Sequence, residues 1–221
     1  MKYDIRKKSK KFRLVFSQAI SLNTSSFPSI KNEFLFRKGF INDVWQSWNY
    51  FWRAYWLAHV RGGLDGRGNR ISGLYSNINE EEAVYFLTTG SLGGSTRPYH
   101  EKTWGDINFI AKVAANITRH SATIVGTNPI ITQHIIFHNA VTVSSAISLL
   151  GNSIKDFQIV RNTSVHLNSH SIKEFQSIIP RYRIVKYKYP TDLVSTISLT
   201  DNKVALVSWH DEMTTFINLV I

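Results

Sequence analysis

The sequence contains no cysteine, which excludes disulfide bonds, thiolate nucleophiles and metal or iron–sulfur sites with cysteine ligands. Its glycine-rich segment 62–73 lacks the Walker lysine–serine pair and the GxGxxG spacing, and the sequence has no GxSxG nucleophile elbow, so neither a phosphate loop of those types nor serine hydrolysis is indicated. Acidic residues are few: 15 Asp and Glu stand against 26 Lys and Arg, and the formal net charge is +11. We therefore expect a protein of a reducing, cytoplasmic compartment with an anionic partner.

Aromatic residues are plentiful, with 13 Phe, 9 Tyr and 6 Trp in 221 residues, so the chain can bury a sizeable core. Trp and Tyr recur at three- and four-residue steps over residues 42–59. This spacing predicts a helix that is capped by Asn42 or Asp43 and ended by Gly62 and Gly63. Such a stripe is most often core or a subunit interface, and a base-stacking platform is the alternative.

Capping residues, prolines and apolar spacing predict several further helices. The glycine-rich segment 62–73 is expected to be a mobile loop, and the basic segment 181–189 a short strand or a loop. Together these patterns favour an all-α helical bundle with minor β structure. The expected helices cover 79–89, 103–119, 128–150 with a break at Gly151, a segment opening at Ser153, 171–179 with a capping box from Ser171 to Glu174, a short helix capped near Thr191, and 204–221.

Basic residues are concentrated at the N-terminus, where residues 1–13 contain seven of them and one acid, Asp4. We predict that residues 1–40 form a basic arm and loop, and that residues 41–221 form a single domain. Such an arm is typical of nucleic-acid binding with salt-dependent affinity, and a solvated tail that only aids solubility is the alternative. The residues expected to bind nucleic acid are Arg6, Lys7, Lys8, Lys10, Lys11 and Arg13.

No formal charge lies between Arg119 and Lys155, a length that would span a bilayer. Asn128, Gln133, His134 and several Ser and Thr make the stretch too polar for lipid. We therefore expect buried core and no membrane contact.

Residues 157–166 place an arginine, an asparagine and a histidine close together, as Arg161, Asn162 and His166. An imidazole can transfer protons near neutral pH because its unperturbed pKa is about 6.5. A guanidinium can hold a phosphate or a developing oxyanion. Residues five apart on an ideal helix differ by about 140° in direction. Arg161 and His166 therefore converge only if the helix bends or ends near His166, if the arginine curls round, or if two subunits share a cleft.

The run from Arg161 to His166 resembles the signature of the HEPN superfamily of helical nucleotide-binding and ribonuclease domains. That signature is an arginine, a polar residue, and a histidine four to six intervening residues after the arginine. Residues 189–193 and a C-terminal helix containing Trp209 and Met213 resemble a group found in bacterial abortive-infection and antiphage systems. The resemblance is specific from about residue 150 onward and only general before it.

The resemblance implies a helical bundle of the HEPN type that acts as a metal-independent endoribonuclease without a cofactor. His166 would act as general base or acid, Arg161 would neutralise charge on the phosphorane, and Asn162 would orient the histidine or bind phosphate. It also implies RNA as substrate, a homodimer, and restraint by a cognate antitoxin or another protein of the defence system.

Other functions stay open. The same domain without catalysis would be a nucleic-acid-binding or scaffolding subunit of a defence complex, and a basic DNA-binding protein of a virus or plasmid is a third class. His166 could instead be a core histidine or a helix cap, and Arg161 a surface ion-pair partner.

Two further pairs that contain a histidine have the spacing of a possible functional site. Arg53 and His59 match the arginine–histidine interval, but Ala54 follows the arginine. His134 and His138 are four apart, but no acid accompanies them at helical spacing, so no metal site is predicted.

Overall fold

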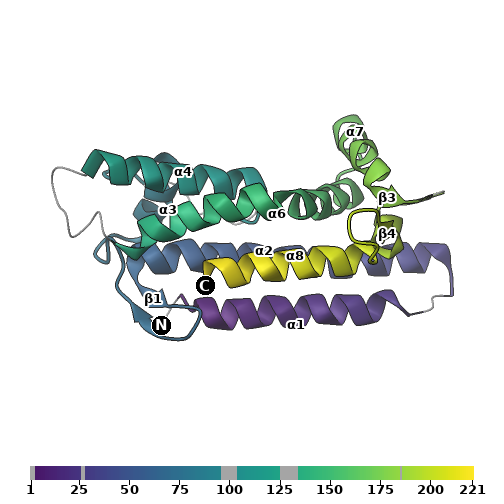
Figure 1. Ribbon diagram of the computed structural model, residues 1–221, viewed down its shortest axis with the longest axis horizontal. Helices are drawn as coiled ribbons and strands as arrows, with labels where there is room; N and C mark the ends of the chain where they lie inside the picture. The colour runs from purple at the N-terminus through teal and green to yellow at the C-terminus, as the bar shows by residue number, and fades with distance from the viewer. Residues whose placement is uncertain (1–2, 26–27, 96–103, 125–133, 185) are drawn as a thin grey trace. The chain divides into compact units, whose positions relative to one another are not determined.

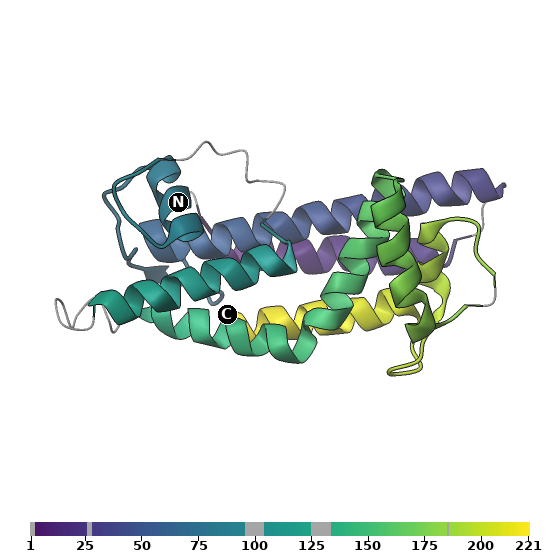
Figure 2. The same ribbon diagram turned by 90° about the horizontal axis from the view of Figure 1, so that it is seen from above.

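The computed structural model describes residues 3–25, 28–95, 104–124, 134–184 and 186–221 (Figures 1 and 2). Two short antiparallel strand pairs, β1–β2 and β3–β4, accompany the helices. The expected all-α fold with minor β structure is confirmed. Its elements are α1 (Ile5–Asn23), α2 (Ile30–Arg61), β1 (Gly63–Leu64), β2 (Arg70–Ile71), α3 (Glu80–Thr89), α4 (Ile107–Ile124), α6 (Ile135–Val165), α7 (Ser169–Ile178), η2 (Ile179–Arg181), β3 (Tyr182–Arg183), η3 (Pro190–Ser195), β4 (Ile197–Ser198) and α8 (Ala205–Val220).

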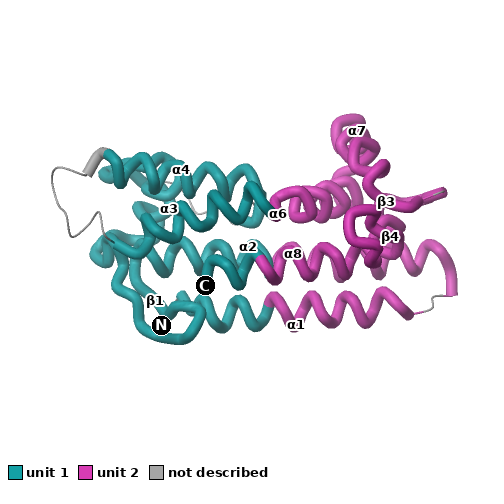
Figure 3. The backbone as a smooth tube through the Cα atoms, in the orientation of Figure 1, with its two compact units in different colours: residues 1–11, 47–149, 216–221 teal, residues 12–46, 150–215 magenta. Residues whose placement is uncertain are grey.

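The chain divides into two compact units (Figure 3). Unit 1 comprises Met1–Lys11, Ser47–Leu149 and Phe216–Ile221. Unit 2 comprises Phe12–Gln46 and Leu150–Thr215. The helices α1, α2, α6 and α8 therefore each contribute residues to both units.

The aromatic stripe of α2 forms the core of unit 1. Trp48, Trp52 and Trp56 are fully buried, and the ring of Trp52 lies 5.4 Å from that of Phe216 in α8. The Trp48 Nε1–H donates to the carbonyl oxygen of Gly105 at 3.0 Å, which satisfies its polar group. The interpretation of the stripe as core is confirmed.

The start of α2 was wrong in the sequence prediction, whereas its end was right. The helix begins at Ile30 rather than at residue 42, so Asn42 lies within it and does not cap it. It ends at Arg61, and Gly62 follows with a φ of 90°, a conformation that glycine adopts without strain.

Much of the N-terminal segment that the sequence predicted as an arm and loop is the helix α1. Asp4 Oδ1 accepts a hydrogen bond from the Lys7 backbone N–H at 2.7 Å, which caps the helix. Between the lysines and arginines of this segment, mostly apolar residues recur on one face of the helix. Burial of that face stabilises the helix. The buried residues recur at alternating steps of four and three: Ile5, Ser9, Phe12, Phe16 and Ala19.

The glycine-rich segment 62–73, expected to be a loop, contains a paired hairpin. Its strands β1 and β2 are antiparallel. Asp65 closes the turn, because its Oδ1 accepts hydrogen bonds from the backbone N–H groups of Arg67 and Asn69 at 2.9 and 2.7 Å.

The helix α6 continues through Gly151, where the sequence predicted a break. A glycine within a helix costs only about 1 kcal/mol relative to alanine. In unit 2, Ile154 and Phe157 on the following turn are fully buried, and their packing outweighs that cost.

By length and composition α6 is the one helix in the described ranges that could cross a membrane, with a mean hydropathy of 1.2 over its most apolar window. Only 28% of that window is buried, so the expectation of buried core holds for one face alone. Ile136, Ala140 and Val143 are buried, whereas Val141 is exposed and Leu149 is 78% exposed. A helix this weakly apolar is little evidence for a membrane span.

Two of the expected helix starts can be compared directly. The helix expected from Asn79 begins at Glu80, and Asn79 caps it: the Asn79 side chain accepts from the Glu82 N–H at 2.9 Å, and the Glu82 carboxylate accepts from the Asn79 N–H at 2.8 Å. The helix expected from Thr103 instead begins at Ile107, and Asp106 caps it through the Phe109 N–H at 3.0 Å. Thr103 itself lies outside the described residues.

His59 is a buried histidine of unit 1 whose two ring nitrogens are both bonded. Its Nδ1 lies 2.7 Å from the Tyr55 carbonyl oxygen, and its Nε2 lies 2.7 Å from the Asn139 side-chain nitrogen. Nδ1 must donate to the carbonyl and Nε2 must accept from the amide, so the ring is held neutral. Burial lowers the pKa of His59 to about 4.

We expect the free energy of unfolding to fall as the pH drops from 6.5 to 4. In this window the unfolded state protonates His59 and the folded state does not, so the unfolded state binds more protons and stability rises with pH. A shift of this size corresponds to about 3 kcal/mol. Urea unfolding of His59→Gln, which cannot titrate, should lose this pH dependence. The exposed His138→Gln should retain it, and equal slopes for the native chain and His59→Gln would refute the assignment.

Candidate functional site

Arg161, Asn162 and His166 lie at the C-terminal end of α6 in unit 2. Arg161 and Asn162 are helical, the helix ends at Val165, and His166 is the next residue. The helix therefore ends next to His166. An end at this place was one of the three arrangements that would let Arg161 and His166 converge.

The Arg161 guanidinium is half-buried and bonded only to neutral oxygens in the described chain. Its Nη1 donates to Asn162 Oδ1 at 3.1 Å, and its Nη2 donates to Asn42 Oδ1 of α2 at 3.1 Å. Its Nε is buried without a hydrogen-bond partner among the described residues. Burial lowers the pKa of Arg161 from its ordinary value, because no carboxylate compensates the charge. A cation in this state attracts an anionic ligand.

Asn42 is a site residue that the sequence did not reveal. It precedes Arg161 by 119 positions, and only the fold brings the two side chains together. The sequence pattern indicated a helix cap for Asn42, whereas its amide oxygen holds the arginine.

The turn that carries His166 is fixed by Ser171. The Ser171 hydroxyl lies 2.6 Å from the His166 carbonyl oxygen, to which it donates, and the His166 N–H donates to the Asn162 carbonyl at 2.8 Å. Asn168 caps α7, since its Oδ1 accepts from the Ser171 N–H at 2.9 Å. The capping box predicted from Ser171 to Glu174 therefore begins three residues too late, because Ser171 is its third helical position and not its cap.

The His166 side chain is exposed, so its interpretation as a core histidine is wrong. Within the described ranges, no hydrogen bond or ion pair joins its ring to Arg161, Asn162 or any other residue. The backbone of His166 is thus held by the protein, while its imidazole is open to a ligand.

A buried polar chain anchors this part of α6 to the rest of unit 2. The Asp156 carboxylate accepts from Tyr182 Oη at 2.8 Å and from Arg181 Nη1 at 2.7 Å. Trp209 Nε1–H of α8 donates in turn to Tyr182 Oη at 2.9 Å. Burial raises the pKa of Asp156 above its ordinary value. The helix that presents Arg161 is therefore held by side chains from η2 and β3, and α8 in turn holds Tyr182.

The basic residues predicted to bind nucleic acid lie on α1. The side chains of Arg6, Lys7, Lys10 and Lys11 are exposed, and those of Lys8 and Arg13 are partly buried. Burial lowers the pKa of Lys8, whose Nζ lies 5.2 Å from the centre of the Tyr50 ring.

Each of the two other pairs, Arg53 with His59 and His134 with His138, has at least one side chain engaged within unit 1. Arg53 is hydrogen-bonded to Glu80, and His59 is the buried neutral histidine described above. His134 uses both ring nitrogens, since Nε2 lies 3.0 Å from the Ser72 carbonyl and Nδ1 accepts from the Ile136 N–H at 3.3 Å. Neither pair presents two unoccupied side chains to a ligand.

The chain matches no protein-family model, and no curated protein or solved structure is significantly similar to it. The resemblance to the HEPN superfamily therefore stays a prediction that rests on Arg161, Asn162 and His166.

Proposed function

We propose that the protein is a metal-independent endoribonuclease whose site consists of Arg161, Asn162 and His166. The observation that carries the proposal is the half-buried Arg161 guanidinium, which has no carboxylate partner in the described chain and lies five positions before an exposed histidine. A guanidinium without an anionic partner, five residues before an exposed imidazole, supplies the two groups that cleavage of a phosphodiester requires.

In the proposed reaction the ribose 2′-oxygen attacks the adjacent phosphorus and the bond from phosphorus to the 5′-oxygen breaks. His166 takes the proton from the 2′-hydroxyl, or it gives a proton to the departing 5′-oxygen. Arg161 stabilises the negative charge on the pentacoordinate phosphorus, and Asn162 orients the histidine or binds phosphate. The products are a 2′,3′-cyclic phosphate and a 5′-hydroxyl, and DNA is inert because it lacks the nucleophile.

We further propose that the enzyme is the toxin or effector of a bacterial antiphage or toxin–antitoxin system. It would act in the cytoplasm as a homodimer and be restrained by a cognate protein. The apolar Leu167, next to His166, is 73% exposed, as expected of a residue that a second chain covers. A dimer cleft would supply two arginines and two histidines to one RNA.

The second candidate is a catalytically inert subunit that binds nucleic acid or scaffolds a defence complex. Two observations favour it. The exposed basic side chains of α1 can bind nucleic acid without any catalytic group, and no bond joins the His166 ring to Arg161 in the described chain.

The test is to incubate the purified protein with a single-stranded RNA in excess EDTA. We expect cleavage, fragments that end in a 2′,3′-cyclic phosphate, and no cleavage of the same strand with 2′-deoxyribose throughout. The control is a strand with one 2′-deoxy position, which should resist cleavage there alone. Binding of RNA without cleavage would favour the inert subunit, and cleavage that requires a divalent cation would exclude the proposed mechanism.

A further inference from the structure

Unit 1 contains a cavity of about 410 Å³ beside the β1–β2 hairpin. It is lined by two arginines, Arg61 and Arg70, by two serines, Ser72 and Ser76, and by three glycines of the hairpin and its flanks. No lining residue is acidic. The volume is in the range of small-molecule sites in proteins, and the lining charge favours an anion.

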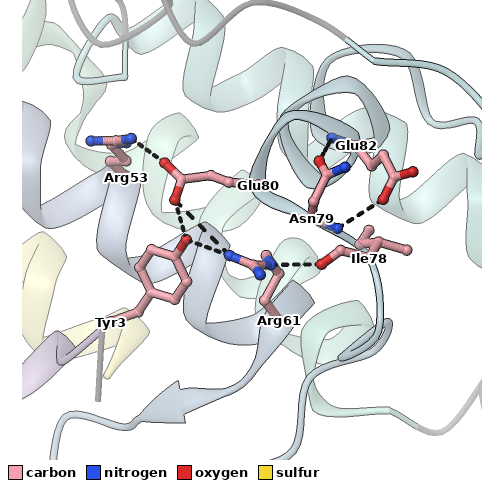
Figure 4. Close-up of polar contacts among 7 residues, drawn as sticks. All are labelled: Tyr3, Arg53, Arg61, Ile78, Asn79, Glu80 and Glu82. Carbon is pink, nitrogen blue, oxygen red and sulfur yellow. Dashed lines mark hydrogen bonds and ion pairs between the residues drawn. The ribbon is translucent and has the colours of Figure 1, made fainter.

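Arg61 is held in one orientation by its neighbours (Figure 4). Its Nε donates to the Ile78 carbonyl at 2.9 Å and its Nη1 donates to Tyr3 Oη at 2.9 Å. Glu80 lies 4.0 Å from Arg61, but its carboxylate is also hydrogen-bonded to Arg53 and accepts from Tyr3 Oη at 2.6 Å. The guanidinium is therefore positioned before a ligand arrives, which lowers the entropic cost of binding.

Arg70 supplies a second, uncompensated charge. Its side chain is exposed and makes no hydrogen bond or ion pair with any residue in the described ranges. Asp65, the acid of the same hairpin, forms no ion pair with it in the described ranges. Its oxygens accept from the backbone of Arg67 and from the backbone and side chain of Asn69.

The glycines beside the cavity let backbone segments pack closely, which fixes the shape of its wall. A Cβ at Gly73 would lie 2.4 Å from the carbonyl carbon of Arg61, and one at Gly63 would lie 2.5 Å from the Tyr3 carbonyl oxygen. The Ser72 hydroxyl can donate a hydrogen bond to a ligand, and so can the Ser76 hydroxyl if it turns away from Asn77 Oδ1, to which it donates at 3.4 Å.

We propose that this cavity binds a small molecule through a phosphate monoester dianion. Two guanidinium groups match its double negative charge, and their planar forks match the geometry of phosphate oxygens. The cavity belongs to unit 1 and uses none of Arg161, Asn162 and His166, so it is independent of the proposed nuclease activity.

The test is calorimetric titration of the full-length protein with adenosine monophosphate, ribose 5-phosphate and inorganic phosphate at constant ionic strength. We expect one site per chain and a dissociation constant that rises roughly 10- to 100-fold in Arg70→Ala. The matched control is Arg67→Ala, which removes the same charge from an exposed position of the same hairpin that does not line the cavity. It should change affinity less than about twofold.

A second variant, Ser76→Asp, places a carboxylate in the cavity at an exposed position and should abolish binding through repulsion. The three ligands distinguish the source of the phosphate. Equal affinities indicate free phosphate, tighter binding of both esters indicates a sugar phosphate, and preference for the adenosine ester indicates a nucleotide. Lack of binding by all three at millimolar concentration, or equal weakening by Arg67→Ala and Arg70→Ala, would overturn the proposal.

Discussion

Replacing His166 by alanine is expected to lower the rate of RNA cleavage roughly 10²- to 10⁴-fold, the usual contribution of a general acid or base. The fold should survive, because the imidazole is exposed and forms no hydrogen bond within the described chain. Its backbone bonds to Asn162 and Ser171 do not depend on the side chain. The measurement is single-turnover cleavage of a labelled RNA, together with thermal unfolding of each variant.

The matched control is His170→Ala. His170 lies four positions further on, its side chain is 83% exposed, and its ring is 3.7 Å from Glu174. Loss of this surface contact should leave cleavage unchanged and stability within about 0.5 kcal/mol of the native value. Equal rates for the native chain and His166→Ala would remove His166 from the mechanism, and equal losses in both variants would indicate a general effect of histidine replacement.

Arg161→Ala is expected to lower the cleavage rate roughly 10²- to 10³-fold, as for other groups that stabilise a charged transition state. Arg161→Lys should recover only part of the rate, since a lysine keeps the charge but loses the planar fork. Asn42→Ala removes one hydrogen bond that orients the guanidinium. An effect of Asn42→Ala on the rate with unchanged RNA affinity would identify Asn42 as a positioning residue.

Most of the helices could be predicted because they carry strong local signals. The aromatic stripe of α2, the start of α3 after Asn79 and the apolar spacing of α8 were all recognised from sequence. The errors arose where tertiary packing was not visible in the local pattern. Gly151 lies within α6, and the charges of α1 concealed the stripe that contains Phe12 and Phe16. In α6 burial of an apolar face outweighs the low helix propensity of glycine, whereas in α1 it stabilises a segment whose lysines and arginines already favour a helix.

The candidate site could be predicted only as far as its residues are close in sequence. The interval from Arg161 to His166 is visible in one segment, whereas the bond from Arg161 to Asn42 joins residues on two helices. The Arg61–Arg70 cavity was missed for a related reason. A glycine-rich segment predicts a flexible loop from sequence alone. Only the pairing of β1 with β2 shows that these glycines bring two backbone segments into contact.

Replacing Trp52 by alanine is expected to destabilise the protein by roughly 3–5 kcal/mol, the usual cost of truncating a buried tryptophan. The side chain is fully buried in unit 1, and its ring centre lies 5.5 Å from that of Trp48, 5.9 Å from that of Trp56 and 5.4 Å from that of Phe216. Alanine would leave a cavity that three rigid rings cannot fill by small movements. The measurement is urea unfolding followed by circular dichroism, and a loss below about 1 kcal/mol would show that the stripe is not a packed core.

Tyr55→Phe in the same stripe should not lower the free energy of unfolding, because it removes a polar atom and leaves the packing intact. The Tyr55 hydroxyl is buried without a hydrogen-bond partner among the described residues, and burial raises its pKa above the ordinary value. A buried hydroxyl that lacks a partner costs free energy, so its removal should leave stability unchanged or raise it by about 1 kcal/mol. A clear loss in Tyr55→Phe would mean that the hydroxyl is hydrogen-bonded in solution. A large loss in Trp52→Ala together with none in Tyr55→Phe would establish that this core is stabilised by the shape and burial of its rings and not by their polar atoms.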